Sequence, residues 1–303
     1  MTELGLVASQ LFNGISLGSI LLLAALGLAL SFGLMNVINM AHGELLMMGG
    51  YLAYLAYRMP VGPWRLPLAL LLAAAGAALF GALLELTVVR RLYGRPLDTL
   101  LATWGVSLLM QQGARSLFGP VGVEVTAPDW LAGAIPLRSI GLPGVELPLV
   151  RLFIIAVAGV VLAGLALVLT RSRWGRLVRA VQEDRDMAEA LGINSRRVDL
   201  VIFMIGTGVA GLAGAALALI APVTPTVGQS YIVYAFLVVI VGGLGSLTGT
   251  AAAALAVGLL SAWLQVFTSV SLADVLLLVV VMAFIQVRPR GIVTRLSRAL
   301  EEA

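Results

Sequence analysis

The sequence predicts an all-α protein, a polytopic transmembrane helical bundle with about eight or nine membrane-crossing segments and two broken helices. Of the 303 residues, 60% are hydrophobic and only 11% are charged, whereas soluble domains carry about 25% charged residues. The apolar residues gather in runs that approach the roughly 20 residues of a membrane-spanning helix. Apolarity within a run such as 20–30 is continuous and does not alternate, so the runs are not β-barrel strands.

The predicted spans follow one another along the chain with short connections. They cover about 12–35, 45–59, 67–89, 97–118, 149–170, 200–221, 232–242, 250–267 and 273–287. The whole chain, 1–303, is therefore expected to form a single membrane domain. Its longest connections are an external loop at about 119–148 and a cytoplasmic loop at about 171–199.

Arginine placement predicts the orientation, because cytoplasmic loops near spans are rich in basic residues. All 19 basic residues are arginines, and 14 of them lie after the third span, after the fifth span or in the C-terminal tail. These regions are expected in the cytoplasm, with the N-terminus outside and the C-terminus inside. The net charge of +4 then reflects a cytoplasmic arginine belt, and nucleic acid is not an expected partner.

The composition also excludes several kinds of chemistry. The chain has no cysteine, no lysine and one histidine, His42. Thiol nucleophiles, zinc–thiolate sites, Schiff-base lysines and Walker A lysines are therefore excluded. The run His42-Gly43-Glu44 lacks the His-Glu-x-x-His spacing of zinc proteases. We expect a chain that is not an enzyme and holds no metal or cofactor of its own.

Two segments, 36–44 and 242–249, interrupt helical runs. Irregular backbone is tolerated in a bilayer only where protein or a water-filled cavity satisfies it, and transporters build substrate sites from paired broken helices. If both breaks lie at depth, small and polar residues line a substrate pathway there: Asn39, His42, Glu44, Gly243 and Gly245. Alternatively, the breaks are cytoplasmic turns, and the polar residues of the first one cap the next helix.

A polar stripe marks the span at 97–118. Thr99, Thr103, Ser107 and Gln111 recur every four residues and so share one helix face, with Trp104 nearby. Such a face is expected to line a pathway. It can also serve helix packing, where polar contacts contribute about 0.6 kcal/mol each.

The cytoplasmic loop contains good helix formers over 176–191, followed by Gly192 as a helix terminator. Leu177, Val181, Ala188 and Leu191 form a partial apolar face on this expected helix. It is either an amphipathic helix at the membrane surface or a coupling helix that enters a partner's groove. The residues proposed for coupling are Glu183, Asp184, Ala188, Glu189 and Gly192.

Several motifs together resemble the permeases of branched-chain amino-acid and urea ABC importers, of the LivH type. They are Val-Ile-Asn-Met-Ala-His-Gly-Glu at 37–44, Gly-Gly-Leu-Gly-Ser-Leu-Thr-Gly at 242–249 and Arg-Pro-Arg-Gly at 288–291. The run Ala-Glu-Ala-Leu-Gly-Ile at 188–193 resembles the loop by which such permeases contact their ATPase. The segments 98–105 and 123–128, together with Met40, look closer to the urea subgroup.

The resemblance implies a multi-pass permease subunit in a bacterial inner membrane. Its implied partners are a second homologous permease, two ATPases that bind ATP and Mg²⁺, and an external solute-binding protein. Urea is the first expected substrate, because Asn39, Thr103, Ser107 and Gln111 are neutral hydrogen-bonding groups. The alternatives are a branched-chain amino-acid permease, whose zwitterionic substrate uses helix termini, and a stand-alone channel or secondary transporter.

Overall fold

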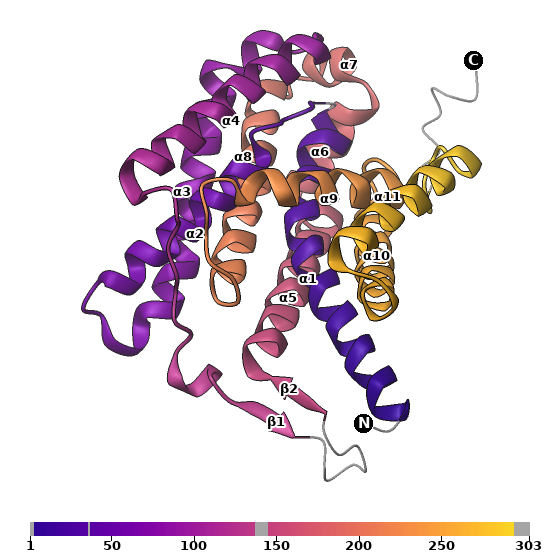
Figure 1. The fold of residues 1–303 in the computed structure, drawn as a ribbon. Coiled ribbons are helices and arrows are strands. Elements are labelled where there is room, and N and C mark those ends of the chain that lie inside the picture. The colour runs from indigo at the N-terminus through magenta and orange to yellow at the C-terminus, as the bar shows by residue number, and fades with distance from the viewer. Residues whose placement is uncertain (1–2, 36, 137–144, 294–303) are drawn as a thin grey trace.

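The computed structural model describes residues 3–35, 37–136 and 145–293. Within them the chain forms a bundle of α-helices with a small two-stranded sheet at one end (Figure 1). The helices are α1 (Glu3–Met35), α2 (His42–Arg58), α3 (Arg65–Thr87), α4 (Pro96–Phe118), α5 (Leu149–Arg171), α6 (Arg173–Glu183), α7 (Arg185–Ala190), α8 (Ser195–Ala218), α9 (Val227–Gly242), α10 (Leu247–Phe267) and α11 (Val270–Val287). The all-α prediction is confirmed.

Helix α1 is the centre of the bundle. It has 33 residues, about 50 Å at 1.5 Å per residue, and packs against α5, α8, α9 and α10. Every residue from Gly18 to Ser31 is buried. A helix that is hydrophobic all round has to be surrounded by protein or lipid, and here other helices supply that cover.

The outer helices show the opposite pattern. Helices α5 and α11 are long and apolar, yet few of their side chains are buried within the chain, as suits helices that face lipid. By length and composition, six helices of the described residues can cross a membrane: α1, the α3 region, α5, α8, α10 and α11. Helices α2, α4 and α9 are shorter or more polar, and the expected eight or nine crossings depend on them.

The two ends of the bundle differ. Figure 1 shows α6 and α7 at one end, called here the α6–α7 end. The start of α1 lies at the other, the β1–β2 end, with strands β1 (Ala134–Pro136) and β2 (Glu146–Pro148), which pair antiparallel. The described parts of the predicted loop, 119–136 and 145–148, include these strands, and Val123 pairs with Val223 of the segment before α9. Residues 137–144 lie outside the described residues.

The helix expected over 176–191 is in fact two helices. Asp184 adopts an extended conformation between α6 and α7 and caps α7, because its Oδ1 accepts a hydrogen bond from the Met187 N–H at 2.9 Å. Gly192 ends α7 with φ +82°, as expected for a terminating glycine. Leu191, expected on the apolar face, is 75% exposed, because the interruption at Asp184 changes the direction of the chain.

Candidate functional site

The first break lies inside the bundle. At the start of α2, His42 Nε2 donates to the Ala24 carbonyl of α1 at 3.1 Å. Ala24 lies eleven residues before the end of α1 at Met35, or about 16 Å along the helix axis. Gly27 of α1 and Gly206, near the middle of α8, pack against each other beside the His42 ring. Helix α2, which follows the first break, therefore begins deep inside the bundle, away from the end of α1.

The second break, at residues 243–246, lies at the α6–α7 end. Gly245 packs against Gly33, two residues before the end of α1, and Gln182 of α6 donates to the Gly33 carbonyl at 3.2 Å. The Ile292 N–H donates to the Val241 carbonyl at 2.8 Å. The chain is broken at both places, as predicted, but only the first break lies at depth. Gly243 and Gly245 therefore do not join the residues of the first break.

The buried face of α4 is polar. Its five buried residues are Thr99, Thr103, Ser107, Gln111 and Ala114, so the predicted stripe faces the bundle interior. The opposite face carries apolar side chains such as Leu109, which is 74% exposed, and Leu117, which is 80% exposed. A helix with a polar interior face and an apolar outer face suits a lipid environment. Trp104 was expected in the pathway but is 49% exposed, because it lies about 100° around the helix from Thr103.

The stripe of α4 meets the start of α2. Ser107 Oγ and Gln111 Nε2 both donate to Glu44 Oε1, at 3.0 Å and 2.7 Å. One turn away, the Met40 N–H donates to Thr103 Oγ1 at 3.0 Å. Asn39 Oδ1 accepts from the Ala41 N–H at 3.0 Å. The structure thus brings five predicted site residues together: Asn39, Glu44, Thr103, Ser107 and Gln111.

Two other predicted residues lie beside this group. His42 points to α1 instead, and because a carbonyl only accepts, its Nε2 carries a proton, while Nδ1 has no hydrogen-bond partner. Thr99 Oγ1 donates to the Leu92 and Arg95 carbonyls at 3.1 Å and 3.0 Å. Thr99 therefore fastens the start of α4 and makes no contact with Glu44.

Unsatisfied polar groups concentrate on the same segment. Among the described residues, the buried side-chain polar atoms without a hydrogen-bond partner are Asn39 Nδ2, His42 Nδ1, Glu44 Oε2, Tyr51 OH and Tyr57 OH. All five belong to the first break or to α2. Each such group costs several kcal/mol inside a membrane, so this cluster needs a functional explanation.

The contact between α2 and α4 is called here the α2–α4 seam. Its residues are Asn39, Glu44 and Tyr51 facing Thr103, Ser107, Gln111 and Phe118. At the α6–α7 end it meets a cavity of about 260 Å³ lined partly by Val37, Tyr93 and Thr99. Toward the β1–β2 end, Tyr51 stacks on Phe118 with ring centroids 4.2 Å apart. Beyond this stack lies an open cavity of about 710 Å³, lined by residues that include Tyr54, Arg58, Arg65, Glu124 and Trp130.

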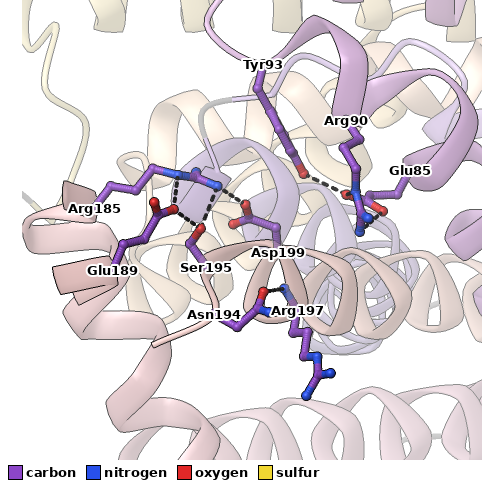
Figure 2. Close-up of polar contacts among 9 residues, drawn as sticks. All are labelled: Glu85, Arg90, Tyr93, Arg185, Glu189, Asn194, Ser195, Arg197 and Asp199. Atoms are coloured by element: carbon purple, nitrogen blue, oxygen red, sulfur yellow. Dashed lines mark hydrogen bonds and ion pairs between the residues drawn. The ribbon is translucent and has the colours of Figure 1, made fainter. Parts of the chain in front are cut away.

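A second polar group connects α7 to α8 and to Tyr93 (Figure 2), and of its members the sequence had singled out only Glu189. Arg185 Nη2 donates to Asp199 Oδ2 at 2.5 Å, and Arg185 also lies 3.6 Å from a Glu189 carboxylate oxygen. Ser195 Oγ donates to Glu189. Burial and the Asp199 and Glu85 carboxylates raise the pKa of the Tyr93 phenol, so Tyr93 remains a hydrogen-bond donor.

The residues predicted for coupling surround α7. Glu183 and Asp184 are exposed just before its start. Within α7, Ala188 is buried and Glu189 pairs with Arg185. Gly192 lies at its end with open space around its Cα. The positions of these residues are compatible with a docking helix.

Comparison with known proteins places the chain in a family. The family model described as "Branched-chain amino acid transport system / permease component" matches residues 10–285. The permease BraD of Pseudomonas aeruginosa, of a high-affinity branched-chain amino acid transport system, is 31% identical over 97% of this chain and 98% of its own length. The LivH permease of Salmonella typhimurium is 29% identical over 94% and 95%, respectively.

A shorter match, to the fructose import permease FrcC of Rhizobium meliloti, is 36% identical and covers 32% of this chain and 29% of that protein. No solved structure matches the chain. These comparisons support the branched-chain amino-acid alternative and give no support to the urea subgroup. The chain belongs to the family of permease components of branched-chain amino acid transport systems.

Proposed function

We propose that this chain is the membrane-spanning permease subunit of an ATP-driven ABC importer for branched-chain amino acids. The match of the family over residues 10–285 and the names of the two nearly full-length relatives support this assignment. The sequence contains no lysine and so no Walker A motif. Two partner ATPases, with bound ATP and Mg²⁺, therefore supply the energy, and a second permease subunit and an external solute-binding protein complete the importer.

The observation that carries this function is the buried Glu44 at the α2–α4 seam. Glu44 is 1% exposed, and it takes part in none of the ion pairs among the described residues. A buried charge without a partner is costly. The ammonium group of an amino acid would supply the missing positive charge at Glu44 Oε2, whereas urea is neutral and would not.

The other parts of the seam match the rest of such a substrate. The Asn39 amide N–H groups include unpartnered donors that suit the substrate carboxylate. The Tyr51 and Phe118 rings, stacked about seven residues along α2 from Glu44, offer apolar surface to a branched side chain. In this proposal Thr103, Ser107 and Gln111 hold Glu44 and the first break in place until substrate arrives.

The proposed direction of transport follows the arginine distribution. The N-terminus lies outside and the C-terminus in the cytoplasm of a bacterial inner membrane. The cavity of about 710 Å³ then receives substrate from the solute-binding protein, and the cavity of about 260 Å³ opens to the cytoplasm. Helix α7 and its flanks, with Glu183, Asp184, Ala188, Glu189 and Gly192, contact an ATPase.

Uptake into proteoliposomes tests the proposal. The chain is purified with its co-expressed partner subunits, and uptake of radiolabelled leucine and urea is measured with ATP, without ATP, and with an ATPase that binds but does not hydrolyse ATP. We expect leucine uptake only when ATP is hydrolysed, and no urea uptake. Urea uptake without leucine uptake would reverse the substrate assignment, and uptake by this chain alone without nucleotide would indicate a channel or secondary transporter.

A further inference from the structure

The cavity at the α6–α7 end of the seam has a defined wall. On one side are Met35, the last residue of α1, and Val37. On the other side are residues 92–95 with Pro96 and Thr99 of α4. Thr99 lies one helical turn from Thr103, which contacts the first break. The cavity is therefore the continuation of the α2–α4 seam toward this end of the bundle.

Tyr93 lines this cavity, and a hydrogen bond holds its hydroxyl group in place. Its hydroxyl donates to Glu85 Oε1 at 3.2 Å. Glu85 is fully buried at the end of α3, and Arg90 donates to its two oxygens at 3.0 Å each. Because Glu85 is held on both oxygens, it cannot follow the Tyr93 ring if the ring moves.

Arg185 holds the same ring from its face. Its guanidinium carbon lies 5.5 Å from the centroid of the Tyr93 ring, within the distance of a cation–π interaction. The guanidinium is positioned by Asp199 of α8 at 2.5 Å and by Glu189 at 3.6 Å (Figure 2). Arg185 is the first residue of α7. A movement of α7 relative to α8 would therefore change the distance between the Arg185 guanidinium and the Tyr93 ring.

We infer that Tyr93 closes the α6–α7 end of the seam and that Arg185, as a positioning residue, lets a partner bound at α7 control this exit. This inference rests on the proposed transport through the seam. It adds a route by which docking reaches the pathway: from α7 through Arg185 to Tyr93, and from the neighbouring Leu92 carbonyl to Thr99 and the polar face of α4.

Thiol labelling tests this inference directly, because the natural chain contains no cysteine. A Val37→Cys reporter places one thiol in the wall of the cavity. The full chain with its partner subunits is kept in membrane vesicles, and the rate of labelling by N-ethylmaleimide, which crosses membranes, is measured. With Arg185→Ala the rate is expected to rise about 5-fold, the factor for a contact of about 1 kcal/mol.

Two controls separate a gate from a general loss of structure. Arg176→Ala removes one exposed arginine from the neighbouring α6 and is expected to leave the labelling rate unchanged. In a Tyr93→Ala background the reporter is already accessible, so adding Arg185→Ala is expected to change nothing further. Arg185→Gln retains hydrogen bonding to Asp199 without the charge and serves if the alanine variant does not assemble.

The inference that Tyr93 forms a gate is rejected if the Arg185→Ala and Arg176→Ala proteins are labelled at the same rate. It is also rejected if Arg185→Ala still accelerates labelling in the Tyr93→Ala background. A functional measurement accompanies the labelling: ATP hydrolysed per leucine imported is expected to rise in Arg185→Ala. The labelling result does not depend on the substrate. If leucine is not imported but labelling responds as expected, the substrate assignment fails and the gate remains.

Discussion

The first break, at residues 37–41, and the second, at residues 243–246, have glycines around them and lead into apolar helices, yet their hydrogen bonding differs. At the second break Ser246 Oγ accepts from the Gly249 N–H at 3.1 Å, and the backbone after α11 bonds back to α9. The first break leaves Asn39, His42 and Glu44 each with an unpartnered atom. A complete set of partners makes a structural turn, whereas an incomplete set at depth leaves groups available to a substrate.

The sharpest test of this difference is Glu44→Gln, and we expect the largest effect there. The side chain keeps its size and can still accept from Ser107, but it loses the charge proposed for the substrate ammonium. Hydrogen bonds to charged groups contribute about 1.5–3 kcal/mol, so leucine uptake is expected to fall about 10- to 100-fold. Uptake per folded protein in proteoliposomes measures it.

The comparison supplies the control for this variant. Gln182→Ala removes the hydrogen bond from α6 to Gly33 beside the second break and is expected to leave leucine uptake within about 2-fold of the wild type. Equal losses in both variants would mean that the two breaks contribute alike and that depth is not what distinguishes them.

Gly43→Ala tests the packing of the first break. A Cβ at Gly43 would overlap the Gly228 carbonyl oxygen of α9, and overpacking costs about 1–3 kcal/mol. We expect a lower midpoint of thermal unfolding in detergent. Gly105→Ala is the matched control, because a Cβ there meets no atom within 4 Å. A Gly43→Ala protein as stable as Gly105→Ala would show that α2 and α9 separate readily.

Ser107→Ala is expected to have a smaller effect on transport. It removes one of two donors to Glu44 Oε1, and such a bond contributes about 0.5–1.5 kcal/mol net. The KM for leucine uptake is expected to rise about 3- to 10-fold. The neighbouring Leu108→Ala, on the exposed face of α4, should leave KM unchanged. If Leu108→Ala raised the KM more than Ser107→Ala, the proposal that substrate binds along the α2–α4 seam would be contradicted.

Ser246→Ala is expected to have the smallest effect on transport. It removes the N-cap of α10, which costs about 1 kcal/mol of stability. Thermal unfolding should therefore begin at lower temperature while leucine uptake at 25 °C stays the same. A clear loss of uptake in a folded Ser246→Ala protein would give the second break a role in transport that its geometry does not suggest.

The helices and the orientation of the α4 stripe follow from local pattern, so the sequence predicts them. A four-residue repeat of polar side chains defines one face wherever the helix lies, and the structure buries that face. The depth of the first break depends instead on which turn of α1 lies beside His42, and the Ala24 carbonyl is 18 residues away. The ionisable His42 and Glu44 distinguish this break from the second one in composition, but they do not give its depth.

Other features were missed for related reasons. Arg185 and Asp199 are 14 residues apart, and their pairing depends on the turn at Gly192 and on the direction in which α8 begins. The division between α6 and α7 had a local signal, because Asp184 precedes three residues whose N–H groups need a cap. The glycines of the second break carried a misleading signal: positive φ at Gly243 and Gly245 requires glycine in an ordinary turn as much as in a pathway.

The even spacing of the α4 stripe has a consequence for how this helix can move. Thr99, Thr103, Ser107 and Gln111 are separated by four residues each, or about 6 Å along the axis. If α4 slid along α2 by that distance, with a small rotation, hydroxyl groups of the next pair would reach Glu44 and the same kind of hydrogen bonds would form again. In that register Thr103 and Ser107 would take the places that Ser107 and Gln111 hold now. The spacing of the stripe would therefore let α4 slide without leaving Glu44 bare of hydrogen-bond donors.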